Sequence, residues 1–255
     1  MNLSPNGVPA IARWNVDDRS DLRFCFVSDL HCFSSRSTVQ THRRLIRDVV
    51  ERCDVCVWGG DLFDFRWSQM GHEDESVAAA LDWLQFQYDA HPTTQFVFLN
   101  GNHDAHGKFA SRLHQWADAR ERFRCGIDAL IAGDALFVHG DVIEKGGTDQ
   151  AFTSYRQSWR DKPMAHPRTS RLYDAAVSAR LHQTVAFAAH RRRRTCLRLV
   201  RWMHRQDPAL MQPVRRVVFG HTHRRIEQYH LKGFEFYNGG AAIKHVNFRP
   251  VELTV

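Results

Sequence analysis

The sequence contains no long hydrophobic run. No apolar stretch reaches the roughly 18 residues that a helix needs to cross a bilayer. The first eighteen residues, MNLSPNGVPAIARWNVDD, also lack the basic and then apolar pattern of a secretory signal. From these two absences we expect a cytoplasmic protein.

Cysteine is neither abundant nor clustered. Six cysteines are scattered along the chain, and only Cys53 and Cys56 have the CxxC spacing that zinc and redox sites use. No second pair follows them and they lead into an apolar segment, so we predict buried free thiols. A cytoplasmic location also argues against disulfides. The other four are Cys25, Cys32, Cys125 and Cys196.

Lysine is scarce, although the chain is basic. Only five of the 35 basic residues are lysines, and the formal net charge is +7. The arginine excess is either a bias of composition or a sign of an anionic partner. Such a partner would be phosphate, nucleic acid or an acidic membrane surface.

Hydrophobic patterning predicts alternating strands and helices. Short apolar runs are typical of buried strands, and the segments between them have apolar residues at helical spacing. We predict strands at residues 22–28, 55–58, 95–99, 135–138, 216–219, 225–230, 234–237 and 251–255, and helices at 38–53, 74–90 and 109–123. This order indicates the α/β fold class.

The middle of the chain departs from this rhythm. Residues 145–212 are dense in charge and mostly helical in pattern. We interpret them as a helical insertion or cap within a single domain that spans residues 1–255. The first 20 residues show no such pattern, and we expect them to form a loosely held arm.

Polar clusters follow five of the predicted strands directly. They are Asp29-Leu30-His31, Gly60-Asp61, Asn102-His103-Asp104, His139-Gly140-Asp141 and His221-Thr222-His223. One cluster alone would be an ordinary turn. However, ligands of α/β sheets bind at the carboxyl ends of the strands, so five such clusters in one chain indicate a site.

The clusters supply seven side chains suited to metal binding. They are Asp29, His31, Asp61, Asn102, His139, His221 and His223. Seven ligands are too many for one tetrahedral zinc ion, and they suit two transition-metal ions that share a carboxylate. Because no thiolate is among them, Mn, Fe or Zn is favoured over a thiolate-rich structural site.

The order of these motifs resembles that of the calcineurin-like metallophosphoesterase superfamily. All five blocks occur in the family order, without substitution at a ligand position. The resemblance implies a four-layer αββα sandwich with two divalent metal ions, of which Mn is the expected one. It also implies the ligand sets: Asp29, His31 and His223 for the first ion, Asn102, His139 and His221 for the second, and Asp61 as the bridge.

The resemblance implies the chemistry as well. Two ions about 3.5–4 Å apart hold a hydroxide that attacks phosphorus, and they neutralise the charge that develops there. His103 is not a ligand in the family; it faces the substrate and protonates the leaving oxygen. We expect Asp104 to accept the other ring N–H of His103 and so to orient it. Asp64 is expected to cap the segment after it or to brace the site.

Within the superfamily, the chain looks most like the UDP-2,3-diacylglucosamine diphosphatase branch. The shared features are the block Gly60–Phe65, the spacing to Asn102 and a helical insertion between His139 and His221. That branch cleaves a nucleotide–lipid pyrophosphate at the membrane surface and prefers Mn. The chain departs from the best-known enzymes of the branch at His103, where they carry arginine, so the exact substrate stays open.

A basic amphipathic helix in the insertion bears on the substrate. Its apolar face is Cys196, Leu199, Val200 and Met203, and a second stripe is Arg194, Arg198, Arg201 and Arg205. The stripe is either a solvated face or a surface for substrate phosphates and anionic lipid. On the second interpretation, Arg194, Arg198 and Arg201 bind substrate, and the protein contacts the inner membrane face peripherally. Further candidates for substrate contact are Arg156, Arg160, Arg168 and Arg171.

Two other functions stay open. The alternative enzyme is a phosphodiesterase or nuclease acting on nucleotides or nucleic acid, although the sequence holds no clear nucleic-acid module. The alternative outside enzymology is a scaffold that keeps the fold in order to bind partners. A scaffold is free to lose metal ligands, and here all seven are present. The sequence therefore favours a metal-dependent phosphoesterase or pyrophosphatase.

Overall fold

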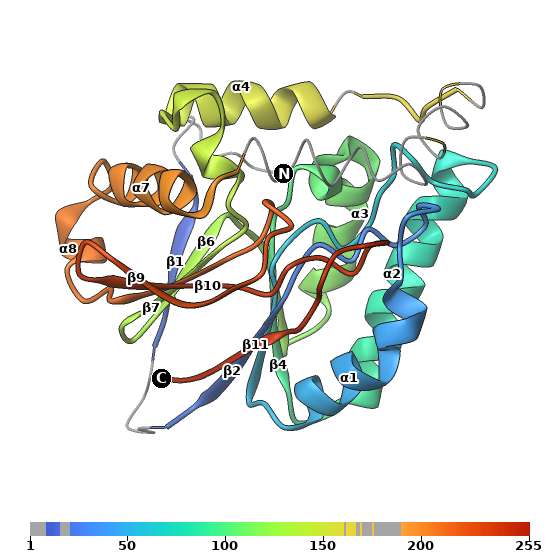
Figure 1. Ribbon diagram of the computed structural model, residues 1–255. Coiled ribbons are helices and arrows are strands. Elements are labelled where there is room, and N and C mark those ends of the chain that lie inside the picture. The colour runs from blue at the N-terminus through green and yellow to red at the C-terminus, as the bar shows by residue number, and fades with distance from the viewer. Residues whose placement is uncertain (1–8, 16–20, 161, 167–168, 170–174, 176–189) are drawn as a thin grey trace.

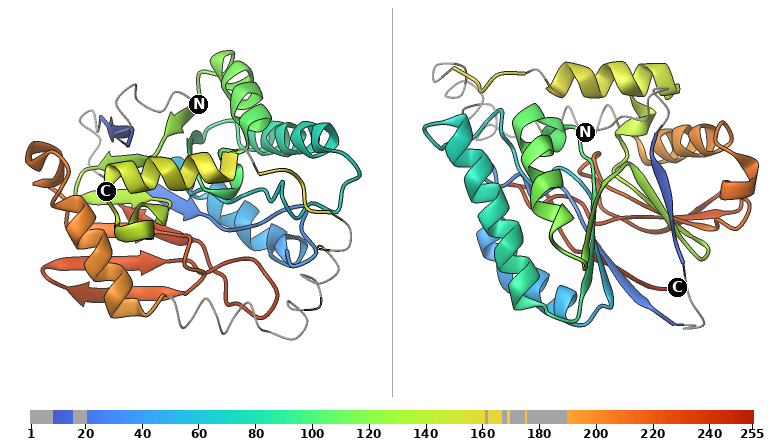
Figure 2. Two further views of the ribbon diagram at one scale, coloured as in Figure 1. Left: turned by 90° about the horizontal axis from the view of Figure 1, so that it is seen from above. Right: turned by 180° about the vertical axis from the view of Figure 1, so that it is seen from behind.

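Two β-sheets lie face to face in the computed structural model, with helices on both outer surfaces (Figure 1). The structure describes residues 9–15, 21–160, 162–166, 169, 175 and 190–255. The layers run helix, sheet, sheet, helix, as the two further views show (Figure 2). This is the αββα arrangement expected from the sequence.

The first sheet is largely parallel. Its order is β11 (Val251–Thr254), β2 (Arg23–Val27), β3 (Val55–Trp58), β4 (Gln95–Leu99) and β5 (Phe123–Ile127), and only β11 runs antiparallel to its neighbour. Three helices pack on its outer face: α1 (Val39–Glu51), α2 (Glu73–Ala90) and α3 (Gly107–Asp118). Val27, Trp58 and Phe98 are register partners, so the loops after β2, β3 and β4 leave the sheet at one level.

The second sheet brings two more polar loops to the same end of the molecule. Its order is β1 (Ile11–Trp14), β6 (Ala129–Ala132), β7 (Ala135–Val138), β8 (Arg216–Phe219), β10 (Phe234–Asn238) and β9 (Ile226–Leu231). β7 and β8 are parallel, and Val138 pairs with Phe219. The residues after these two strands therefore start side by side.

Aromatic side chains fill the space between the sheets. Phe24 and Phe26 of β2 both stack on Phe137 of β7, with ring centroids 5.5 and 6.2 Å apart. All three are buried, and each contributes roughly 1.5–3 kcal/mol through burial of its apolar side chain. The packing holds the strand ends of the two sheets at a fixed spacing, which positions the site.

The expectation of a loose N-terminal arm is wrong for residues 11–14. They form the edge strand β1, which pairs in parallel with β6, and the Ala10 N–H donates to Asp128 at 2.9 Å. Neither β6 nor β5 was expected from the sequence. Phe123 begins β5, whereas the predicted helix included it. The helix α3 ends earlier, at Asp118.

The predicted helical segment at residues 145–212 contains helices in two different places of the fold. α4 (Asp149–Arg160) lies across the strand ends and contacts two short 3₁₀ segments, η1 (His103–Ala105) and η2 (Asp141–Gly146). α7 (Arg192–Met203) packs on the outer face of the second sheet, and the short α8 (Pro208–Met211) follows it. α7 is thus the outer helical layer of the sandwich, while much of 161–189 lies outside the described residues. The boundaries 145–212 stay a prediction.

The structure confirms the predicted apolar face of α7 and the prediction that the cysteines are free thiols. Cys196, Leu199, Val200 and Met203 are all buried, which leaves no apolar face of this helix for a lipid surface. All six cysteines are free, and five of them are buried. Within the part of the chain that the structure describes, no helix has the length and apolar character needed to cross a membrane.

Candidate metal centre

The loops that follow five strands meet at one end of the sandwich. Asp29 and His31 follow β2, Asp61 follows β3, Asn102 and His103 follow β4, His139 follows β7, and His221 and His223 follow β8. Their potential ligand atoms form overlapping groups in which all atoms lie within 4.8 Å of one another. These groups are Asp29–His31–His223, His31–Asp61–His103 and Asp61–His139–His221. Asp61 belongs to two of them, as a bridging carboxylate would.

Neighbouring ligand atoms have the spacing of atoms that share one ion. Bonds of about 2.1 Å at angles between 90° and 109° place adjacent ligand atoms about 3.0–3.4 Å apart. His31 Nε2 lies 3.0 Å from His223 Nε2, which in turn lies 3.4 Å from Asp29 Oδ1. His139 Nε2 lies 3.3 Å from Asp61 Oδ1.

Two ligand atoms in this region are buried and have no hydrogen-bond partner among the described residues. They are Asn102 Oδ1 and His139 Nε2. Leaving a buried polar atom unpaired costs about 1–3 kcal/mol, so such atoms are rare without a purpose. The other ring nitrogen of His139 contacts the Gly59 carbonyl at 2.8 Å, which directs Nε2 into the site. Both unpaired atoms come from residues expected to bind the second ion, so the residues present fit a metal centre.

The backbone at the site is strained. Asp29, His31, Asp61, His221 and His223 all have positive φ, between 45° and 64°. Non-glycine residues rarely adopt this left-handed region, and each such residue costs on the order of 1–3 kcal/mol. Strain of this kind is typical of functional sites, because the surrounding structure must hold it in place.

Two glycines of the motifs are required by close approach of a carboxylate. A Cβ at Gly101 would lie 2.3 Å from Asp61 Oδ1, and a Cβ at Gly220 would lie 2.4 Å from Asp29 Oδ2. Any other residue at these two positions would push the carboxylate out of place. This explains why glycine precedes both Asn102 and His221.

The two expected ion positions differ in charge. Burial lowers the pKa of His31 to about 3, and it also lowers the pKa of His223, so both rings are neutral and ready to bind a cation. Burial works against the charge on His139, but Asp61 outweighs it and raises the pKa of His139 to about 10. Without metal, the His139 ring at the second ion position is therefore protonated, whereas the His31 and His223 rings at the first ion position are neutral.

We predict that filling this position releases a proton. Since the pKa of His139 is about 10 without metal, the ring is protonated at pH 7.5, and a ligand histidine must be neutral. Metal affinity at this position should therefore rise with pH up to about 10, while the other position binds over a wider range. Calorimetric titrations in buffers of different ionisation enthalpy count the released protons. Equal proton release and pH dependence at both positions would contradict the assignment.

His103 lies where a general acid is needed. Its ring meets His31 edge-on at a centroid distance of 4.7 Å, and Trp159 of α4 packs on it at 4.4 Å. Burial disfavours its charge, but the Asp64 and Asp61 carboxylates outweigh this and raise the pKa of His103 above its usual value. A protonated imidazole beside the metal groups can donate a proton.

The expectation that Asp104 orients His103 is wrong. The Asp104 carboxylate instead accepts the backbone N–H groups of Leu62 and Phe63 at 3.2 and 3.0 Å. Its pKa is raised to about 7, mainly by burial, so it is no strong anion at neutral pH. Asp104 thus fastens the loop that follows β3 instead of orienting the ring.

Asp64 has the orienting position instead. Asp64 Oδ1 lies 3.0 Å from His103 Nδ1, an ion-pair distance, although the two groups are not aligned as a hydrogen bond. Asp64 Oδ2 lies 3.2 Å from Arg36 and 3.6 Å from His31 Nδ1. Arg36 Nη2 also lies 2.9 Å from His31 Nδ1, so a guanidinium donor and a carboxylate acceptor both face this ring nitrogen. Asp64 also accepts the Trp67 N–H, so it both braces the site and caps the next segment.

We predict that Asp64→Asn and Asp104→Asn have different effects. Asp64→Asn should lower turnover by about 10- to 100-fold. It should also lower the pKa of the catalytic acid, as measured from the pH dependence of the rate, because it removes the negative charge that favours protonated His103. Asp104→Asn should mainly lower the melting temperature, because it weakens the acceptor for two backbone N–H groups. Rate–pH profiles and thermal melts of both variants check this. A shifted alkaline limb in Asp104→Asn alone would reverse the two roles.

Arg156 does not face substrate, contrary to expectation. It is buried and forms a two-pronged ion pair with Asp141, and its Nη1 lies 3.7 Å from Asp128. It also donates to the Asn100 carbonyl, so it ties α4 to the loops beside the metal groups. Arg160 is half-buried at the end of α4, and Arg168 and Arg171 lie outside the described residues.

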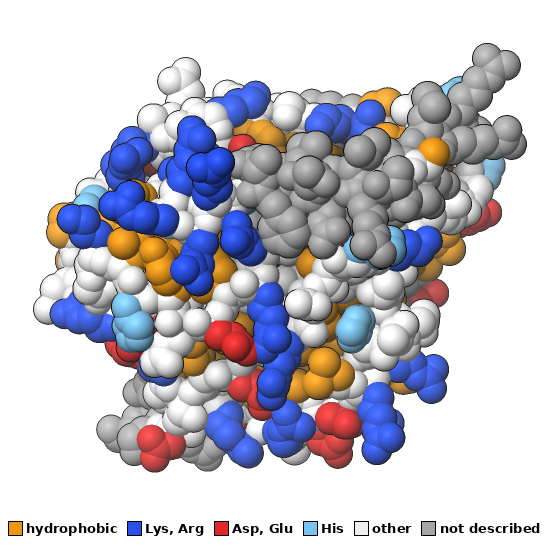
Figure 3. Space-filling model, viewed as in Figure 1, with side chains coloured by type: hydrophobic (Ala, Val, Ile, Leu, Met, Phe, Trp, Pro, Cys, Tyr) orange, Lys and Arg blue, Asp and Glu red, His pale blue; other side chains and the backbone are white. Residues whose placement is uncertain are grey.

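Arg194, Arg198 and Arg201 lie together on one side of α7. They line a cavity of about 770 Å³ with Gly146, Arg191, Arg193, Leu197 and Arg205. Among the described residues no acidic side chain lines it, and Figure 3 shows basic side chains gathered over α7. Gly146 lies at the end of η2, two residues beyond Glu144, whose side chain contacts His221. The basic cavity therefore adjoins the metal groups.

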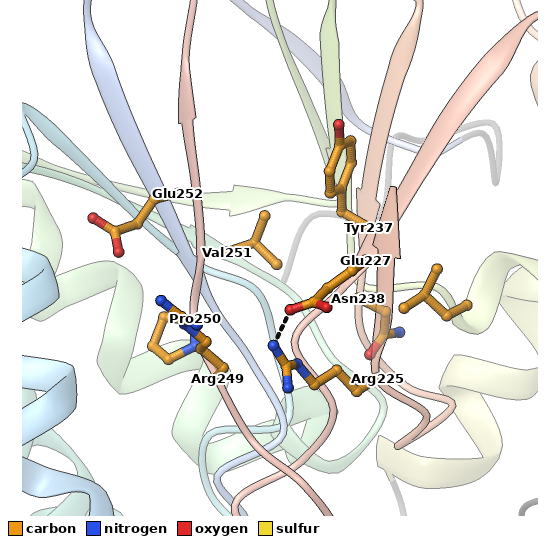
Figure 4. A pocket seen from close by; sticks show the side chains of 9 residues that line it. Arg225, Glu227, Tyr237, Asn238, Arg249, Pro250, Val251 and Glu252 are labelled. Atoms are coloured by element: carbon orange, nitrogen blue, oxygen red, sulfur yellow. Dashed lines mark hydrogen bonds and ion pairs between the residues drawn. The ribbon is translucent and has the colours of Figure 1, made fainter. Parts of the chain in front are cut away.

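A second pocket lies away from the metal groups. It has a volume of about 310 Å³ and opens between β9, β10 and β11, where Arg225 pairs with Glu227 (Figure 4). Asn238 on its wall donates to the Gly220 carbonyl and to Thr222 at 3.0 and 3.2 Å. Asn238 thus supports the His221–His223 loop from the side of this pocket. None of the expected metal ligands lines the pocket.

Four residues near the site were not predicted from the sequence: Tyr155, Trp159, Glu144 and His190. Tyr155 and Trp159 of α4 pack against His221 and His103. Glu144 and His190 form a further group with His221 within 4.8 Å. None of the four directly follows a strand, so only the position of α4 and η2 in the fold reveals them.

Comparison with known proteins agrees with this geometry. The family model described as calcineurin-like phosphoesterase matches residues 22–225. The chain belongs to this family, and it is therefore a metal-dependent phosphoester hydrolase, for which the family implies two divalent ions. A dimetal phosphatase from Danio rerio is a similar solved structure, with 14% sequence identity, 89% of each chain covered and a TM-score of 0.47. No curated protein sequence matches the chain.

Proposed function

We propose that the protein hydrolyses a pyrophosphate or phosphodiester bond in a substrate that carries further anionic groups, with UDP-2,3-diacylglucosamine as the leading candidate. The observation that carries this proposal is the arginine-lined cavity beside the metal groups. A plain phosphate monoester needs only the metal centre. A nucleotide-linked lipid has a second phosphate and a long remainder, which need binding surface of their own.

Seven residues are assigned to the metal ions in this proposal. Asp29, His31 and His223 would hold the first ion, Asn102, His139 and His221 would hold the second, and Asp61 would serve both. Two bound divalent ions, with Mn as the leading candidate, lower the pKa of water and neutralise charge on the phosphoryl group. Asp29 and Asp61 are suited to this, since their histidine neighbours outweigh burial and hold the pKa of both carboxyls below its usual range.

His103 protonates the leaving oxygen. Asp64 holds the ring from one side and Trp159 packs on it, so the imidazole has little freedom to turn. Because α4 carries Trp159 and is tied down by Arg156, this helix forms one wall of the substrate site. The leaving group is thereby placed between α4 and the strand-end loops.

The arginines of α7 bind the part of the substrate beyond the scissile bond. Six guanidinium groups line one cavity, and such a concentration of charge attracts anions. The apolar face of α7 is already buried in the core, so membrane contact in this proposal is electrostatic. Peripheral binding to the anionic inner membrane face would bring the protein to a lipid substrate.

The test compares two substrates with Mn-loaded protein: UDP-2,3-diacylglucosamine and bis-p-nitrophenyl phosphate. The proposal expects fast cleavage of the lipid nucleotide and slow cleavage of the small diester. Arg194→Gln, Arg198→Gln and Arg201→Gln together should raise KM for the lipid nucleotide by about tenfold or more and leave the small diester unaffected. A matched control changes the exposed Arg43, Arg44 and Arg47 of α1 to glutamine.

Cleavage of the small diester alone would overturn the lipid assignment. The metal chemistry would then stand, and nucleotides or nucleic acid would be the substrates to test next. In that case the cavity arginines should govern the salt dependence of nucleic-acid binding. An unchanged KM for the lipid nucleotide in the triple variant would remove the cavity from the substrate site.

A further inference from the structure

A third group of metal-binding side chains adjoins the expected pair of ions. Glu144, His190 and His221 each offer one ligand atom, and these atoms lie within 4.8 Å of one another. Glu144 Oε1 lies 3.1 Å from His221 Nε2, within the spacing of two adjacent ligands on one ion. None of the expected roles of the seven ligands requires Glu144 or His190.

His190, a member of this group, also has a buried nitrogen without a partner in the part of the chain that the structure describes. Its Nδ1 is buried and has no hydrogen-bond partner among the described residues, a property it shares with the ligand atoms Asn102 Oδ1 and His139 Nε2. The His190 ring meets that of His221 edge-on at 5.7 Å. A buried imidazole nitrogen without a partner, beside a carboxylate, is a ready cation ligand.

The backbone turns sharply to present Glu144. Gly140 and Lys145 have positive φ values of 115° and 46°, and Glu144 between them is extended, with ψ of 154°. This breaks the 3₁₀ segment η2 at Glu144 and carries the chain from His139 past His221. Lys145 is a non-glycine residue in the left-handed region, so the turn is held at a cost in energy.

We propose that Glu144 and His190, together with His221, form a third divalent-cation position beside the dinuclear centre. This inference rests on the proposed function and extends it. Three protein ligands leave one position open, as in catalytic zinc sites, and that position can accept a substrate oxygen. Gly146 of the arginine-lined cavity follows Glu144 by two residues, so the third position adjoins that cavity. A second phosphate of the substrate fits there.

The third ion is expected to bind more weakly than the other two. Glu144 is the single carboxylate in the group, and its neighbour Arg198 adds positive charge close to both Glu144 and His190. His221 also belongs to the group with Asp61 and His139, so it can serve both ions only as an imidazolate that has released its ring proton, with one ring nitrogen on each ion. The ligands that belong to the third position alone are Glu144 and His190.

Metal stoichiometry tests the proposal without reference to activity. Metal-free full-length protein is titrated with Zn²⁺ and, separately, with Mn²⁺ by calorimetry, and bound metal is measured after equilibrium dialysis. The parent protein should bind about three ions per chain, the third at least tenfold more weakly, and Glu144→Gln and His190→Ala should each bind about two. The exposed Glu51 and His204 provide matched controls, as Glu51→Gln and His204→Ala, which should keep three.

The outcomes separate this inference from the proposed function. Saturation of the parent at two ions would overturn the third position and leave the dinuclear centre standing. Fewer than two ions in the folded parent would overturn the dinuclear centre itself. Three ions in both Glu144→Gln and His190→Ala would show that the third ion binds elsewhere. Circular dichroism of each variant checks that a lost ion does not reflect a lost fold.

Discussion

Replacement of Asp61 by alanine is expected to remove bound metal and to lower kcat/KM by at least about 1,000-fold. Asp61 is buried and belongs to the groups on both sides of the centre, so it is placed to contact both ions. Without it, the remaining ligands lose their shared anion, and two cations at close range repel each other without compensation. Metal analysis of the purified variant and its rate on a small phosphodiester check the prediction.

A second substitution at Asp61 separates metal binding from folding. Asp61 Oδ1 also accepts the backbone N–H of His103 at 2.7 Å, so the change to alanine removes a structural hydrogen bond as well. Asp61→Asn keeps the shape and the acceptor but lacks the charge, and it should fold like the parent and still lose metal. Asp82→Ala, at an exposed position of α2, is the matched control. Hydrolysis by Asp61→Ala at the parent rate would show that the centre does not use two bridged ions.

Four of the five strands that carry the site could be predicted from sequence to the residue. β3, β4, β7 and β8 have the bounds expected for them, because each is a short, mainly apolar run that stops at a polar cluster. β2 was predicted at residues 22–28 and is one residue shorter at each end. Burial of such a run on both faces leaves no other register. At the margins of the sheets the strands are half-exposed, so they are not continuous apolar runs and cannot be recognised in this way.

The strands β1, β5 and β6 show why the margins escaped prediction. β5 is half-exposed and contains Gly126, which has a φ of 77°, and its polar residues hide the strand pattern. β6 follows β5 after a single residue, Asp128, so no turn of several residues marks its start. β1 is an edge strand whose partner lies more than 100 residues away in the sequence. Pairing of this kind depends on the fold and leaves no local pattern.

The residues of the site also fall into those that could be predicted from the sequence and those that could not. The ligands that directly follow strands were found from the sequence because parallel strands end at one level. The partner of His103 was missed because adjacency in sequence favoured Asp104. The 3₁₀ turn η1 directs Asp104 toward the Leu62 and Phe63 amides, while Asp64 reaches His103 from a different loop. Contacts between loops are decided by the packing of the strands beneath them.

Replacement of His103 by alanine is expected to lower turnover by about 100- to 10,000-fold and to leave metal content unchanged. The ring is positioned by Asp64 and Trp159, and its raised pKa favours the protonated form that a general acid requires. The loss should depend on the leaving group. p-Nitrophenolate leaves without a proton, so His103→Ala should affect it least, whereas an alkoxide leaving group should show the full loss.

The dependence on leaving group distinguishes an acid from a metal ligand. His103 also lies in a group with His31 and Asp61, where an imidazole nitrogen could bind the first ion. If His103 were a ligand, His103→Ala would lose metal and slow all substrates by the same factor. His103→Gln and the exposed His230→Ala serve as the conservative variant and the control. Unchanged metal content with a loss that grows with the pKa of the leaving group therefore identifies His103 as the proton donor, and a uniform loss with depleted metal rejects that role.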